Sequence, residues 1–213
     1  MKRALVFRGG WQGHDPEGSA GLARRSLEPE GFAVDVVDTL QPLDDAVTLT
    51  AYDLIVPVWT MGELNAERER NLMRAVEEGT GLAGWHGGMG DAFRASLGYK
   101  MMVGGQFVAH PGDVRRYIVR VTAEDPITRG LDDFELVSEQ YYMHVDPSNE
   151  VLAETTFSGD ALPWIEGVVM PVAWKRRWGR GRVFYLSIGH AVAEFAVPQA
   201  ATLLRRGLVW ASR

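Results

Sequence analysis

The 213-residue chain contains no cysteine. Without a thiol, the protein can form no disulfide, has no thiolate nucleophile and binds no metal through sulfur. Any reaction that passes through an acyl intermediate on cysteine is therefore excluded.

The chain also lacks a long hydrophobic run and an excess of basic residues. Its first apolar run, residues 4–7, stops at Arg8, which is too short for a signal-peptide core, and no run approaches the roughly 20 residues of a membrane span. The 22 basic and 28 acidic side chains leave a formal net charge of −6, whereas non-specific binding of nucleic acid needs a basic footprint. We therefore expect a cytoplasmic protein that binds neither nucleic acid nor membranes. The five basic residues between Lys175 and Arg182 are expected to lie on a solvated hairpin.

The first half of the chain alternates strand and helix patterns. Apolar runs at residues 4–7, 32–37, 54–58 and 81–85 predict strands, and helical spacing predicts helices at 19–30 and 65–79. This order favours an α/β fold with right-handed crossovers and a doubly wound, mostly parallel sheet.

The second half is less regular. Residues 117–121, 134–137, 151–153, 172–174 and 182–187 predict strands, and a last helix is expected at 199–210. We expect some of these strands to extend the sheet and others to form an irregular, antiparallel excursion. Because the chain has no internal repeat and no low-complexity linker, we predict one domain over residues 1–213.

Three of the five histidines follow strands that should be parallel. His14 comes after the first strand and a glycine-rich loop, His86 follows residues 81–85 directly, and His190 ends the last strand. The ligand crevice of an open α/β sheet lies at the carboxyl ends of its strands. A single histidine there is more often structural, but three on separate strands favour a functional site.

The segment 84–88, GWHGG, has the pattern of a sharp strand-to-helix turn. Flanking glycines permit the strained backbone, so that the central polar side chain points into the crevice. His86 could act there as a general base, a metal ligand or a hydrogen-bond donor to a ligand. The alternative is a tight turn that merely tolerates histidine. Residues 9–13 lack the spacing of a phosphate-binding loop, so a nucleotide site is not indicated.

The chain resembles the ThuA-like (trehalose utilisation) family over nearly its whole length. The resemblance rests on segments that occur in order along the chain: 8–14 (RGGWQGH), 84–88 (GWHGG), 104–110 (GGQFVAH), 138–141 (SEQY), 171–174 (PVAW), 181–190 (GRVFYLSIGH) and 206–211 (RGLVWA). It implies a flavodoxin-like fold of the class I glutamine amidotransferase type. His86 stands where that wider group carries its cysteine nucleophile, and His190 stands near the place of that cysteine's histidine partner. One departure is Asp125, at a position where family members often have histidine.

The resemblance also implies a role in the utilisation of disaccharides and oxidised sugars. We predict His86, His190 and Glu139 as catalytic residues, and the following as substrate-binding residues: Trp11, His14, Trp85, Gly87, His110 and Tyr141. The partner would be a small carbohydrate, and the reaction a hydrolysis, isomerisation or elimination on a sugar or keto-sugar. Without cysteine, glutamine amidotransfer is excluded.

Three questions stay open at this point. A histidine–glutamate set suits a divalent, zinc-like ion, for which the candidate ligands are His86, His110, His190 and Glu139. The alternative to an enzyme is a non-catalytic sugar-binding or regulatory module on an amidotransferase-like fold. Histidine nitrogens close to the carboxylate of Glu139 would favour catalysis, whereas histidines tied singly to backbone carbonyls would favour a structural role. Whether the chain forms a homo-oligomer also remains open.

Overall fold

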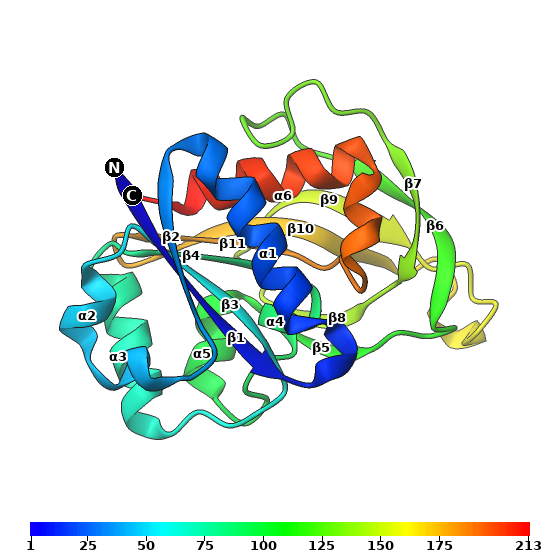
Figure 1. Cartoon of the computed structure of the whole chain (residues 1–213). Coiled ribbons are helices and arrows are strands. Elements are labelled where there is room, and N and C mark those ends of the chain that lie inside the picture. Colours follow the sequence, from blue (N-terminus) through cyan, green and yellow to red (C-terminus); the bar gives the residue numbers. More distant parts are fainter.

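A nine-stranded sheet runs through the protein and carries helices on both faces (Figure 1). The structure is a computed structural model and describes residues 1–213. The strands lie in the order β2 (Phe32–Val37), β1 (Lys2–Gly10), β3 (Leu54–Thr60), β4 (Gly81–Trp85), β11 (Gly181–Leu186), β10 (Val169–Trp178), β9 (Glu150–Thr156), β6 (Val114–Val121) and β7 (Phe134–Glu139). The first five are parallel, and each of the last four pairs antiparallel with its neighbour. The predicted mostly parallel sheet with an antiparallel excursion is confirmed.

The helices divide between the two faces of the sheet. The α-helices are α1 (Pro16–Leu27), α2 (Ala46–Thr50), α3 (Ala66–Glu77), α4 (His86–Gly90), α5 (Leu97–Val103) and α6 (Pro198–Ala211). Short 3-10 turns occur at Gln12–His14, Glu28–Glu30, Gln41–Asp44, Pro163–Ile165 and Val192–Ala196, and β5 (Gly105–Ala109) pairs with β8 (Tyr142–Val145) in a separate two-stranded sheet. No helix combines the length and the hydrophobicity that a membrane crossing would need.

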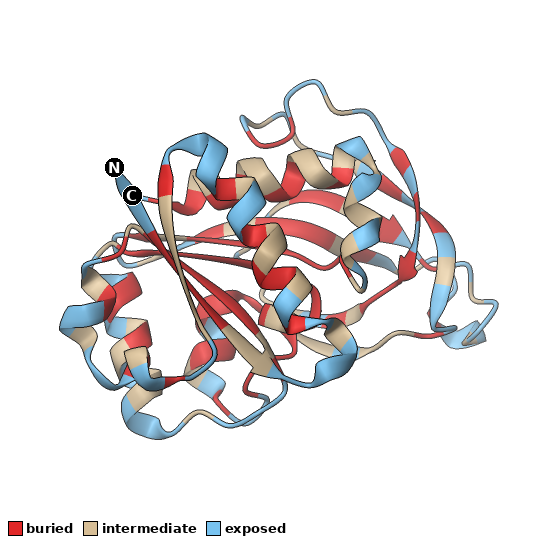
Figure 2. Ribbon diagram, viewed as in Figure 1, coloured by how far each residue is buried: buried red, intermediate tan, exposed pale blue.

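Two hydrophobic clusters hold the helices against the sheet. Alternate side chains of β1 face opposite ways, so Val6 packs in the cluster under α1 and α6, whereas Leu5 packs in the cluster under α3 and α5. Figure 2 shows the central strands buried and the outer helix faces exposed. Continuous apolar runs such as residues 54–58 follow from this arrangement, since both faces of those strands are covered.

The local signals set most of the element boundaries. Asn65 caps α3, because its side-chain oxygen accepts a hydrogen bond of 2.8 Å from the backbone amide of Arg68. Helix α1 begins three residues earlier than predicted, because Asp15 caps it and Pro16 occupies its first turn. The elements α2, α5, β5 and β8 were not predicted; all are short, and their patterns are too brief to show a period.

The antiparallel half of the sheet brings β7 back to the edge where the parallel strands end. Four successive antiparallel pairings lead across the sheet from β11 through β10, β9 and β6 to β7, so β7 runs in the same direction as β4 and β11. Glu139, the last residue of β7, therefore lies at their carboxyl ends. Four strands separate β7 from β4 in the sheet, yet the side chains of Glu139 and His86 are in contact. The sheet must therefore curl, and Figure 1 shows β6 and β7 turned over its end.

The basic hairpin between β10 and β11 is less solvated than the sequence suggested. Arg176 is buried and donates hydrogen bonds to Asn149 and Ser148. Lys175 is ion-paired with Asp125, the residue that replaces the expected histidine. The prediction of a solvated hairpin is wrong for these two residues, because the loop before β9 and the loop after β6 supply polar partners for them.

A buried lysine makes the stability of the fold depend on pH. Lys100 on α5 donates a 3.0 Å hydrogen bond to the carbonyl of Gly90. Burial lowers its pKa to about 8; the charge of Asp91 opposes this shift and that of Arg94 adds to it. Since the unfolded chain then binds more protons than the folded one between pH 8 and 10.5, this lysine costs stability below pH 8, and the cost disappears as the pH rises.

We expect Lys100→Met to remove this dependence. The unfolding free energy of the wild type relative to the variant should rise by up to about 3 kcal/mol from pH 7.5 to 10.5. Denaturant unfolding of both proteins at several pH values measures this difference. The contribution of tyrosine titration to the unfolding free energy cancels in the difference, because both proteins contain the same tyrosines. A constant difference across this window would contradict the prediction.

Candidate functional site

His86 begins α4 in a strained backbone conformation. Its φ is 44°, in the left-handed region that residues other than glycine rarely adopt. The hydroxyl of Tyr185 donates a 3.1 Å hydrogen bond to the His86 carbonyl, and the ring of Tyr141 stacks on the imidazole at 4.0 Å. The predicted sharp turn from strand to helix at the carboxyl edge of the sheet is present, and the fold maintains it at an energetic cost.

Both ring nitrogens of His86 have a partner. Nδ1 lies 2.9 Å from the backbone oxygen of Ser187, and Nε2 lies 3.1 Å from Oε2 of Glu139. A carbonyl can only accept, so Nδ1 carries a hydrogen and donates it. When Nδ1 carries the hydrogen, Nε2 of a neutral His86 and Oε2 of Glu139 are both acceptors. Their short contact therefore requires a proton, or a metal ion in its place, between them.

Glu139 is the centre of the site. Its second oxygen, Oε1, lies 3.3 Å from Nδ1 of His190 and 3.8 Å from Nε2 of His110. Burial acts most strongly on the Glu139 pKa and raises it, but the hydrogen bond from His86 and the charges of His86, His190 and His110 together outweigh burial and lower the pKa. The carboxylate form is thus favoured although the side chain is only 10% exposed.

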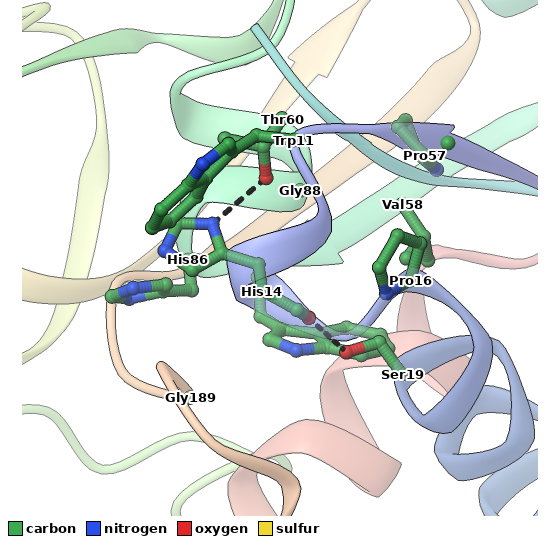
Figure 3. Close-up of a pocket in the computed structure, with 12 residues that line it drawn as sticks. Trp11, His14, Pro16, Ser19, Pro57, Val58, Thr60, His86, Gly88 and Gly189 are labelled. Atoms are coloured by element: carbon green, nitrogen blue, oxygen red, sulfur yellow. Dashed lines mark hydrogen bonds between the residues drawn. The ribbon is translucent and has the colours of Figure 1, made fainter.

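His14 completes the ring of imidazoles from the other side. Its Nδ1 lies 2.8 Å from the hydroxyl of Thr60, and Ser19 donates to its carbonyl (Figure 3). Burial lowers the pKa of His14 to about 3, with the nearby charges of His86 and His190 acting in the same direction and that of Glu139 opposing them. His14 is therefore neutral at physiological pH, and one of its two ring nitrogens is unprotonated.

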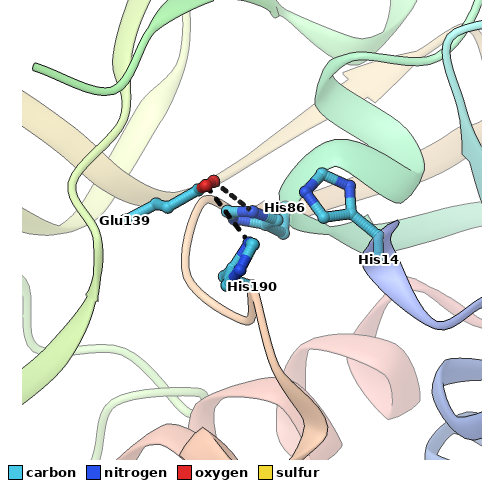
Figure 4. A group of neighbouring side chains, drawn as sticks. All are labelled: His14, His86, Glu139 and His190. Atoms are coloured by element: carbon cyan, nitrogen blue, oxygen red, sulfur yellow. Dashed lines mark hydrogen bonds and ion pairs between the residues drawn. The ribbon is translucent and has the colours of Figure 1, made fainter. Parts of the chain in front are cut away.

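His190 reaches the site because a glycine precedes it. Gly189 has φ of 114°, and a side chain there would approach the rings of Trp85 and Phe195 to within 2.8 Å. The chain can therefore pass closely over these rings and turn the imidazole of His190 toward Glu139, as Figure 4 shows. Nδ1 of His190 is buried and lacks a hydrogen bond of good geometry.

Four side chains converge closely enough to hold one ion. One potential ligand atom from each of His14, His86, Glu139 and His190 lies within 4.8 Å of the other three (Figure 4). His110, predicted as a candidate ligand, lies outside this set, and its Nε2 approaches only the Oε1 atom of Glu139 among the four side chains. His14, predicted to contact substrate, takes its place. His144 is exposed on β8.

The remaining predicted substrate-binding residues fall into two groups. Trp11 is 47% exposed and lies edge-on to the ring of His14. Trp85 is buried in the core against Phe195 and offers almost no exposed ring face, and Tyr141 is buried against His86. These two aromatic rings position the histidine turn and the loop before His190.

Gly87 sets the position of His14. A Cβ atom built on Gly87 would lie 2.4 Å from Cε1 of the His14 ring and 3.1 Å from the Thr60 hydroxyl. We expect Gly87→Ala to push His14 out of the cluster and to weaken ligand or metal binding about tenfold, with little change in thermal stability, because the ring is only partly buried. Gly21→Ala, which meets only the flexible end of Arg25, is the matched control. Unchanged binding in Gly87→Ala would contradict this account.

Residues that the sequence analysis missed line a hollow next to the cluster. This hollow has a volume of about 120 Å³ and shares His14 and Glu139 with the cluster. Asp91, Arg94, Met61 and Phe107 contribute to its wall together with Trp11, His110 and Tyr141. Asp91 and Arg94 stand three residues apart immediately after the glycine-rich turn.

Comparison with known proteins gives the family. The model of the ThuA family, described as trehalose utilisation, matches residues 3–211. The chain belongs to the ThuA family. Family membership supports a role in carbohydrate utilisation, as the resemblance implied.

Solved structures agree with the fold. A ThuA-like protein from Bacteroides uniformis superposes with a TM-score of 0.81 at 20% identity, over 99% of this chain and 91% of that one. One from Parabacteroides merdae gives 0.78 at 19% identity, over 99% and 89%. A protein from Salmonella typhimurium described as cytoplasmic gives 0.70 at 17% identity over the full length of both chains. No curated protein matches the chain.

Proposed function

We propose that this ThuA-family protein is an enzyme that moves protons on a sugar or keto-sugar. The observation that carries the proposal is the carboxylate of Glu139, which lies within 3.1–3.8 Å of nitrogens of His86, His190 and His110 at the ends of the strands. Such contacts between a carboxylate and imidazoles are those that general acid–base catalysis uses. The family's link to trehalose utilisation supports a carbohydrate as substrate.

The two oxygens of Glu139 suit different tasks. Oε2 is fixed by His86, whose ring is anchored in turn by the backbone of Ser187, and Oε1 faces His190 and the hollow. Oε1 would accept a proton from the carbon next to the sugar carbonyl, while His190 would give a proton to the carbonyl oxygen. The resulting enediol can be reprotonated on the neighbouring carbon, which is isomerisation, or can expel a leaving group, which is elimination; hydrolysis would use the same base to activate water.

The residues also fit a divalent cation. Thr60 and Ser187 hold the Nδ1 atoms of His14 and His86, an arrangement that orients the Nε2 atoms as in protein metal sites. Nδ1 of His190 is buried without a hydrogen bond, and three imidazoles with one carboxylate form a donor set that zinc accepts. Glu139, His86, His14 and His190 would hold such an ion. It would polarise the substrate oxygen in place of the proton that His190 supplies in its absence.

Metal analysis tests this part of the proposal independently of activity. We expect protein purified without a histidine tag to bind about one zinc-like ion per chain, and His14→Ala to lose most of it. Added zinc should raise the melting temperature of the wild type, because an ion that binds only the folded state stabilises it. His144→Ala, which removes an exposed histidine outside the cluster, is the control. Equal metal content in the His14 variant and the wild type would reject this site.

The reaction itself is tested by a screen. Trehalose, other disaccharides and 3-keto-sugars are incubated with the metal-analysed protein, and products are identified by NMR. Deuterium uptake from D₂O next to the carbonyl would support proton abstraction, and cleavage without it would indicate hydrolysis. Binding of a sugar without any turnover would favour the alternative, a non-catalytic sugar-binding or regulatory module.

We also propose a cytoplasmic location. The Salmonella typhimurium protein of the same fold is described as cytoplasmic, which supports this proposal.

A further inference from the structure

The hollow beside the cluster has room for one sugar ring. A buried water needs roughly 10–15 Å³ of such space, so the 120 Å³ between Trp11 and Arg94 accommodates on the order of ten non-hydrogen atoms. A hexopyranose ring with its hydroxyls is of this size, and a second ring would project into solvent. Trp11, which is 47% exposed, presents an aromatic surface on which a ring can pack.

An arginine–aspartate pair forms the polar wall of the hollow. Nε of Arg94 donates to Oδ1 of Asp91 at 2.6 Å, and Nη2 donates to Oδ2 at 2.8 Å. The Asp91 side chain is 4% exposed and that of Arg94 is 51% exposed, so the buried carboxylate fixes the guanidinium at the surface of the hollow. Two of the five N–H groups of Arg94 are used in this way, and three remain as donors.

The charges in the hollow nearly cancel. Asp91 neutralises Arg94, and the carboxylate of Glu139 shares a proton or a cation with His86. A sugar acid would therefore meet an arginine whose charge is already balanced, next to the further carboxylate of Glu139. Sugar hydroxyls accept hydrogen bonds, which matches the three N–H donors that Arg94 still offers.

We propose that the Arg94–Asp91 pair binds two neighbouring hydroxyls of a single uncharged sugar ring and selects against sugar acids. This inference rests on the proposed function, since it supplies the substrate class for the same site. Asp91 and Arg94 are specificity residues in this role: Arg94 provides the hydrogen bonds, and Asp91 both orients it and cancels its charge.

Equilibrium binding of two probes tests the proposal. Methyl α-D-glucoside and D-glucuronate are titrated into the wild type, Asp91→Asn, Arg94→Met and Arg74→Met. The wild type should prefer the glucoside by at least about tenfold. Arg94→Met should weaken glucoside binding about tenfold or more, as expected for loss of hydrogen bonds from a charged donor. Arg74→Met removes an exposed arginine that is likewise paired with a carboxylate, that of Glu78, and should change neither affinity.

The decisive variant is Asp91→Asn. It keeps the shape of the side chain and exposes the charge of Arg94, so the preference should move at least about tenfold toward D-glucuronate. The proposal would be overturned by any of three results: an unchanged preference in this variant, a wild type that prefers D-glucuronate, or no binding of either probe. If Asp91→Asn does not fold, the loss of glucoside binding in Arg94→Met tests the proposal independently. These measurements need no turnover, so they remain interpretable if the catalytic proposal fails. If the enzyme is active but Asp91→Asn leaves the preference between the two probes unchanged, only the sugar subsite is rejected.

Discussion

Glu139→Gln should lower turnover by a factor of about 10³, while the protein remains folded. The amide cannot accept a proton at the reacting carbon, and it cannot balance the charge that His86, His190 and His110 place around it. The substitution preserves the size of the side chain, so the packing near β7 should change little. Steady-state kinetics on the substrate found by the screen measures kcat, and circular dichroism with thermal unfolding reports the fold.

Glu135→Gln is the matched control for this experiment. Glu135 lies on the same strand, is exposed, and pairs with Arg116 away from the cluster. Its variant should retain full activity. If Glu139→Gln kept more than about a tenth of the wild-type kcat, the carboxylate would not be the base, and the proposed proton transfer would fail.

His86→Asn should reduce turnover by about 10²–10³ and should cost less stability than other substitutions at this position. Asparagine adopts the left-handed conformation that φ of 44° requires more readily than most residues, so the strain at the start of α4 should not increase. It cannot, however, bridge Ser187 and Glu139 as the imidazole does. Both kcat and the denaturation midpoint should be measured.

His86→Val supplies the opposite result at the same position. A β-branched side chain tolerates positive φ poorly, so this variant should lose stability by about 1–3 kcal/mol as well as activity. Activity equal to that of the wild type in His86→Asn would show that the ring serves only the turn, which is the structural alternative raised by the sequence.

The parts of the site that the sequence predicted depend on local patterns. His14, His86 and His190 each follow a strand whose apolar run is visible, and the rule for strand ends places them together although 104 positions separate His86 from His190. The glycines around His86 also indicated its turn. These signals require no knowledge of the path of the chain between the elements.

The parts that escaped depend on that path. Glu139 was predicted as a site residue. It reaches the site because the antiparallel half of the sheet curls, and this follows from a strand order that no local sequence pattern encodes. Arg94 was missed because an exposed arginine is ordinary in sequence, and only burial of its partner Asp91 marks it. Trp85 shows the reverse: its aromatic type suggested sugar stacking, but its ring lies in the core.

The central place of β11 has a consequence for how the protein is made. This strand lies between β4 and β10, and its pairing with β4 joins residues about 100 positions apart, as in Val183 with Leu82. While the ribosome is still producing the intervening segment, β4 presents an open edge to other chains. Long-range parallel pairing of this kind is slow to form. Newly synthesised chains would therefore benefit from chaperone protection of that edge until β11 emerges and closes it.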